Sequence, residues 1–172
     1  MEAARHLILR NGLRATTMEG IAREAGIAKP TLYAQFADKD AVFSGVVDEI
    51  LDLLAIAFDE GLAGQGDIAE RVGNAVAGQF LALAEALQGS PHASALMTEH
   101  RRSGPQFREK DLRSEEEIAA NLRATGVVDA EALARVIMAA SYGIALKTTN
   151  AATMAADIRL VCHRLIAPAL PK

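Results

Sequence analysis

The chain has 172 residues, of which 51% are hydrophobic and 4% aromatic, and its formal net charge is −4. Its length allows one large or two small domains, and its apolar content excludes an intrinsically disordered chain. No uncharged apolar run reaches the roughly 18 residues of a membrane span, and no secretion signal opens the sequence. The single cysteine, Cys162, excludes an intrachain disulfide and favours a reducing, cytoplasmic setting, where it is expected as a buried structural thiol.

A short first helix is expected before Asn11, and two short helices around a glycine turn are expected over residues 16–39. Thr16 and Glu19 have the spacing of a capping box, which places the N-cap at the threonine. Gly26 ends the helix, because glycine adopts the left-handed conformation without steric cost. The apolar residues expected to bury this segment are Ala4, Leu7, Ile8, Ile21, Ala22, Ala25, Ile27, Leu32 and Phe36.

The second helix of this pair has a polar face typical of a helix that reads DNA. Lys29, Thr31, Tyr33 and Gln35 can donate hydrogen bonds to phosphates or to base edges in a major groove. Lys39, at the start of the next helix, can reach the DNA backbone. A plain helical hairpin with a hydrated polar face is the alternative, but the whole string of residues in register favours a helix-turn-helix.

This segment resembles the DNA-binding domain of the tetracycline-repressor (TetR) family of bacterial transcriptional regulators. The resemblance covers about the first 45 residues, and the rest is similar in helix pattern and length only. The first helix is shorter than is usual in the family, and Gln35 stands where a histidine is common. The matching residues are Gly12, Thr16, Thr17, Ile21, Ala22, Ala25, Gly26, Lys29, Pro30, Thr31, Leu32, Tyr33, Phe36, Lys39 and Phe43.

The resemblance implies a role for each residue of the predicted reading surface. Thr17 would contact a phosphate at a helix start, and Lys29, Pro30 and Tyr33 would touch bases or the sugar-phosphate edge. The residues expected to hold phosphates are Thr31, Gln35 and Lys39.

Charge is distributed unevenly along the chain. Residues 1–45 contain six Lys or Arg against five Asp or Glu, and the remainder contains twelve against seventeen. The predicted DNA-binding end is therefore nearly neutral. We expect modest non-specific affinity per monomer and a need for a dimer to gather enough phosphate contacts.

The rest of the chain is predicted to be helical throughout, which gives an all-α fold of about nine helices. A long helix should run from Lys39, capped by Asp38, to about Glu60, and the glycine-rich stretch 61–66 should break the chain. Further helices are expected over residues 67–88, 91–102, 106–125, 129–148 and 153–168. The expected domains are 1–45, for DNA binding, and 46–172, for effector binding and dimerisation.

The last two helices are apolar over wide arcs, which indicates burial on more than one side. Packing against a second copy fits this pattern, because paired reading helices about 34 Å apart would read a palindromic site. A monomer core is the alternative, and the family resemblance also implies a four-helix dimer interface. The expected interface residues are Leu133, Val136, Ile137, Ala140, Ile144, Ile158, Val161 and Leu165.

The resemblance also implies a small-molecule effector site in the C-terminal domain, whose occupancy disfavours the DNA-binding geometry. Its candidates are large and mostly apolar, which suggests a hydrophobic or aromatic effector, although such residues are more often simple core than ligand contacts. They are Phe80, Leu83, Leu87, Met97, His100, Phe107, Met138 and Tyr142.

No residue pattern predicts catalysis, a cofactor or a metal site. The spacing of His92, His100 and His163 does not suit metal ligation. The sequence therefore predicts a homodimeric, ligand-responsive repressor that binds double-stranded operator DNA. The alternative is a helical ligand- or protein-binding module with a vestigial DNA-binding head.

Overall fold

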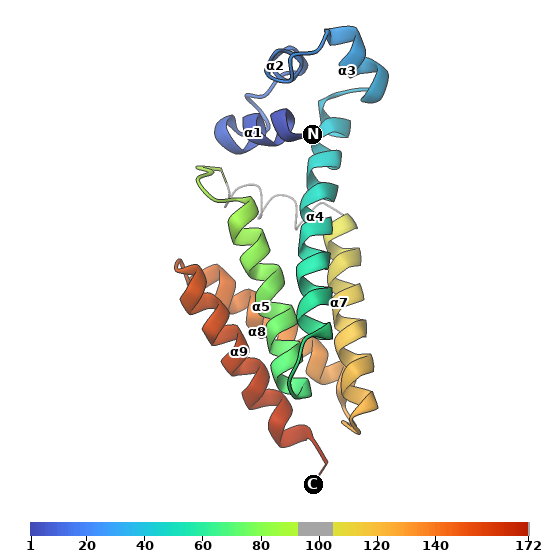
Figure 1. The fold of residues 1–172 in the computed structure, drawn as a ribbon, viewed down its shortest axis with the longest axis vertical. Coiled ribbons are helices and arrows are strands. Elements are labelled where there is room, and N and C mark those ends of the chain that lie inside the picture. The colour runs from blue at the N-terminus through green and yellow to red at the C-terminus, as the bar shows by residue number, and fades with distance from the viewer. Residues whose placement is uncertain (93–104, 172) are drawn as a thin grey trace. The chain divides into compact units, whose positions relative to one another are not determined.

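The computed structural model describes residues 1–92 and 105–171, and within these ranges the fold is all-helical, as predicted (Figure 1). Eight α-helices and one short 3-10 helix are present there, close to the nine helices expected. The helix expected over residues 91–102 lies almost wholly outside the described residues. The elements are α1 (Glu2–Asn11), α2 (Met18–Glu24), α3 (Lys29–Gln35), α4 (Lys39–Ala63), α5 (Ile68–Ala86), α7 (Pro105–Ala124), α8 (Ala130–Lys147), α9 (Ala151–Ile166) and η1 (Ala167–Ala169).

The chain divides into two compact units. The first comprises Met1–Asp52 and Ala86–Phe107, and the second comprises Leu53–Glu85 and Arg108–Lys172. Helix α4 therefore contributes its first half to one unit and its second half to the other. No described helix is long and apolar enough to cross a membrane.

Capping residues fix several helix ends near their predicted positions. The Glu70 backbone N–H donates to Asp67 Oδ1 at 2.9 Å, and Glu70 Oε2 accepts from the Asp67 N–H at 3.1 Å, so this pair forms a reciprocal capping box at the start of α5. Helix α9 was expected to begin at about residue 153, but it begins two residues earlier, at Ala151. Asn150 is the N-cap, because its side chain accepts the Thr153 N–H at 2.9 Å.

The glycine-rich stretch after α4 does not begin where the sequence suggested. Gly61 lies inside α4, and a Cβ there would stand only 2.4 Å from the backbone nitrogen of Ala75 on α5. Gly78 has the same role from the other side, since its Cβ would lie 3.0 Å from the Ala57 carbonyl oxygen. These glycines let two backbones approach closely, so Gly61 serves packing rather than chain breaking.

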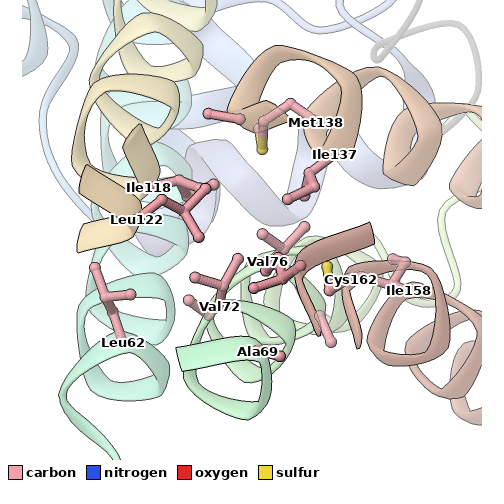
Figure 2. Packing of buried hydrophobic residues seen from close by; sticks show 14 of the residues in the cluster. Leu62, Ala69, Val72, Val76, Ile118, Leu122, Ile137, Met138, Ile158 and Cys162 are labelled. Carbon is pink, nitrogen blue, oxygen red and sulfur yellow. The ribbon is translucent and has the colours of Figure 1, made fainter. Parts of the chain in front are cut away.

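One continuous apolar core fills the second unit. Figure 2 shows residues of five helices converging on it: Leu62 from α4, Val72 and Val76 from α5, Ile118 and Leu122 from α7, Ile137 and Met138 from α8, and Ile158 and Cys162 from α9. Ile137 and Ile158 were expected at a dimer interface. Both are 0% exposed within the single chain, so they build this core and present no surface to a second copy.

Cys162 is completely buried in this core, as predicted, and it is a free thiol. Desolvation by burial raises its pKa from the usual value near 9 to about 12. The reactive thiolate is therefore scarce at neutral pH, which supports a structural role.

We expect Cys162 to resist iodoacetamide at pH 8 in the folded protein and to react readily in urea. Because the thiol has a higher pKa folded than unfolded, its contribution to stability is complete below about pH 9 and declines as pH rises toward about 12. Mass spectrometry after timed labelling measures the reactivity. Labelling of native protein at the denatured rate would contradict this burial.

Candidate nucleic-acid interface

Helices α1, α2 and α3 form the predicted helix-turn-helix in the first unit, with α2 packed against both of its neighbours. Ala4, Leu7 and Ile8 of α1 are buried, as expected. The turn after α2 is a Schellman motif. The N–H of Gly26 donates to Arg23 O at 3.2 Å, and that of Ile27 donates to Ala22 O at 3.0 Å.

Gly26 adopts φ +66°, which confirms the predicted helix stop. Two burial predictions for this turn are wrong, because Ala25 and Ile27 are exposed; Ile27 retains 38% of its surface. Backbone hydrogen bonds close this turn, so its conformation does not depend on burial of an apolar side chain.

The start of α2 is also capped differently from the prediction. Thr17, not Thr16, is the N-cap, and its Oγ1 accepts the Gly20 N–H at 3.1 Å. Thr16 is 3% exposed and its hydroxyl donates to Gly12 O at 2.9 Å, so it secures the preceding turn. The carboxylate of Glu19, expected to complete the capping box, instead pairs with Lys29 of α3.

Helix α3 presents the predicted reading surface. Pro30 lies in its first turn, and Leu32, 4% exposed, anchors its inner side while Phe36 is half-buried. The predicted DNA-contacting side chains lie on the outside. The exposed residues of that set are Thr17, Lys29, Pro30, Thr31, Tyr33 and Gln35.

Two side chains on this surface are already positioned by contacts within the protein. The Lys29 ammonium forms an ion pair with the Glu19 carboxylate and lies 5.7 Å from the centre of the Tyr33 ring, within cation–π range. The hydrogen bond to Lys29 lowers the pKa of Glu19, and the same bond raises the pKa of Lys29. The sequence did not reveal this pair, because nothing in the spacing of residues 19 and 29 predicts contact across a turn.

Lys39 is the seventh predicted contact, and it is half-buried. Its Nζ donates to Leu13 O at 3.0 Å, so it fastens the turn between α1 and α2 to the start of α4. Asp38 caps that helix as predicted, accepting the Ala41 N–H at 2.8 Å.

The predicted effector residues are distributed over both units. Leu87 and Phe107 belong to the first unit, whereas Phe80, Leu83, Met138 and Tyr142 belong to the second. Phe80 and Tyr142 meet edge to face, with ring centres 5.1 Å apart. Met97 and His100 lie outside the described residues.

Polar side chains that the sequence did not single out lie beside the second group. Gln79 is 3% exposed; its Oε1 accepts from Lys110 Nζ, and its Nε2 lies 3.8 Å from Met138 Sδ. The Tyr142 hydroxyl donates to Asp111. These groups place hydrogen-bonding capacity inside an otherwise apolar bundle.

A separate surface groove of about 440 Å³ lies on the second unit between α5 and α9. None of the predicted effector residues lines it. Its lining residues are Gln65, Ala69, Glu70, Asn74, Arg159, Leu160 and His163.

An all-helical chain with a capped helix-turn-helix and an exposed polar second helix has the architecture of a DNA-binding regulator. Residues 1–46 match the sequence model of the family described as bacterial regulatory proteins, tetR family. Residues 1–46 therefore match the N-terminal sequence of the TetR family, and the chain has the fold of solved transcriptional regulators.

Solved structures of low sequence identity share this fold along nearly the whole chain. A transcriptional regulator from Rhodococcus sp. Rha1 is 21% identical, with a TM-score of 0.78 over 98% of this chain and 94% of its own. The fatty acid degradation regulator FadR from Bacillus halodurans is 18% identical, with a TM-score of 0.67 over 96% and 91%. The TetR family transcriptional regulator PfmR from Thermus thermophilus is 21% identical, with a TM-score of 0.63 over 99% and 95%. No curated protein matches the sequence.

A substitution at Lys39 can separate two roles of its ammonium group. One is the hydrogen bond to Leu13 O, which stabilises the fold, and the other is a contact with a DNA phosphate. Replacing Lys39 with Met should lower the free energy of unfolding by about 1 kcal/mol, because one hydrogen bond is lost. If the ammonium also holds a phosphate, the variant should bind every duplex more weakly and reduce the salt slope by about 1. Urea unfolding and fluorescence anisotropy at several salt concentrations measure the two effects.

Lys147→Met is the matched control, because it removes the same charge from an exposed lysine outside the helix-turn-helix. If Lys39→Met unfolds with the free energy of the wild type, the hydrogen bond from Lys39 to Leu13 O does not stabilise the fold. A wild-type salt slope would argue against the phosphate contact.

Proposed function

We propose that this protein is a sequence-specific transcriptional regulator, a homodimeric repressor released from a palindromic operator by a small, mainly apolar effector. The observation that carries the proposal is the exposed polar face of α3, presented by a helix-turn-helix whose turn is closed by backbone hydrogen bonds and whose α2 is capped by Thr17. Side chains held on such a rigid element can reach base edges without a large ordering cost.

The dimer is proposed through the outer faces of α8 and α9, which pack against each other within the chain. Val136, Leu146 and Leu160 are 50%, 79% and 55% exposed on these two adjoining helices, so they offer apolar surface that a second copy can cover. The other predicted interface residues keep part of their surface exposed and can join this face. They are Leu133, Ala140, Ile144, Val161 and Leu165.

The effector is proposed to bind within the helical bundle of the second unit, near Phe80, Met138 and Tyr142. The aromatic and thioether side chains favour an apolar body, and the adjoining Gln79 amide favours a single polar group on it. Binding would favour a separation of the two reading helices that fits the operator poorly.

A helical binding module with a vestigial reading head is the second candidate, and it predicts no preference for any DNA sequence. We assign no catalytic role to the chain, and turnover of a bound ligand would revive that possibility. As a regulator of bacterial genes it would act in the cytoplasm.

Selection of bound duplexes from a random DNA pool tests the proposal directly. We expect an enriched palindrome, because a two-fold dimer presents the same reading helix to each half-site. Tyr33→Ala should weaken binding to that palindrome while the dimer persists. Absence of enrichment, from protein shown to be folded and dimeric, would favour the binding-module alternative.

Replacing Val136 with Asp should dissociate the dimer, because two copies would bury unpaired carboxylates in an apolar interface. Analytical ultracentrifugation should show a folded monomer, and affinity for the selected palindrome should fall with it. Leu112→Asp on α7 is the matched control, since Leu112 is similarly exposed at 56%. A Val136→Asp variant that remains dimeric would remove this face from the interface.

A further inference from the structure

Among the exposed carboxylates of the helix-turn-helix, Glu19 is notable because its partner is a predicted DNA contact. Its carboxylate lies on α2, and its side chain is 62% exposed. It is paired with Lys29, a predicted DNA contact on α3 whose side chain is 50% exposed. A carboxylate at this place is repelled by phosphates and also neutralises the neighbouring cation.

The pair constrains Lys29 as well as neutralising it. The ammonium has three N–H donors, and one of them is given to Glu19 Oε1. The centre of the Tyr33 ring lies 5.7 Å from the same nitrogen. Lys29 therefore has one contact with α2 and one with Tyr33 of its own helix, and both restrict where its ammonium can lie.

We infer that Glu19 is a positioning residue that enforces sequence selectivity, by holding Lys29 on the reading face and withholding its charge from DNA of arbitrary sequence. This inference rests on the proposed function. Non-specific binding depends on neutralising phosphates, so a lysine already paired with a carboxylate contributes little to it. In the operator complex the restrained lysine still contributes a directed contact.

The net charge of residues 1–45 is small, so a single carboxylate such as Glu19 changes a large part of it. Residues 1–45 hold six basic and five acidic side chains, so removing one carboxylate doubles the net positive charge. A single exposed ion pair contributes little to stability, and the effect of Glu19 is therefore expected in DNA binding rather than in folding.

The test compares Glu19→Gln with wild type on two duplexes, the selected palindrome and a duplex of random sequence. Glutamine keeps a hydrogen-bond acceptor and removes the charge. Affinity for the random duplex should rise more than affinity for the palindrome, so the specificity ratio should fall. The salt slope on the random duplex should steepen by about 0.9, so the gain at 50 mM salt should shrink about 3.5-fold by 200 mM.

Glu24→Gln is the matched control. Glu24 is on the same helix with a 42% exposed side chain, undergoes the same change of charge, and lies near His6, 4.0 Å away, rather than Lys29. The effect of Glu19→Gln should also be mostly lost in a Lys29→Ala background. Thermal unfolding of each variant should match its parent, because the Thr17 cap is untouched.

Three results would overturn the role of Glu19: equal gains for Glu19→Gln and Glu24→Gln, an undiminished gain without Lys29, or equal gains on both duplexes. The random duplex requires no knowledge of the operator, so the comparison of Glu19→Gln with Glu24→Gln on that duplex does not depend on the selection. Failure of the wild type to bind any duplex would instead overturn the proposed function.

Discussion

The close approach of α4 and α5 is the constraint on which the second unit depends. At Gly61 and Gly78 the two backbones come so near that a Cβ would meet main-chain atoms at 2.4 and 3.0 Å. Small residues at a crossing allow this approach, and the large side chains on either side then interdigitate. Val72 and Val76, one turn apart on α5, are 0% exposed as a result. The dense centre they help to build also encloses Cys162, which explains why its thiol is desolvated.

The first unit combines buried apolar side chains with helix ends that are closed by hydrogen bonds. Thr17, Asp38 and the Gly26 turn each close a helix terminus, and Thr16 and Lys39 secure the turn before α2 through main-chain carbonyls. Such local bonds fix short helices that would be marginal alone, since an isolated seven-residue helix does not recover its nucleation cost. Capping therefore adds to the burial of Ile21 and Leu32 in holding α2 and α3 in place.

Periodicity and turn chemistry allowed the sequence to predict the all-α fold, the long α4 and the Gly26 stop, because each depends on residues near one another in the chain. The failures involve contacts between distant segments. Gly61 was interpreted as a break because its partner, Ala75, lies on another helix. Ile137 and Ile158 were assigned to an outer face, yet apolarity alone does not show which side of a helix faces its own core. Thr16 and Thr17 are both suitable caps, and only the geometry of the preceding turn decides between them.

The same distinction explains why the exposed polar face of α3 was predicted and its acidic neighbour was not. Lys29 and Tyr33 lie one turn apart on one helix, so their shared face follows from the sequence. Glu19 reaches them from α2 across the turn, and its position depends on how the two helices cross. A nearly neutral head that places one of its few carboxylates against a reading lysine is poorly built for binding DNA by charge alone. In the proposed dimer, discrimination would come from directed contacts and from the summed contribution of two copies.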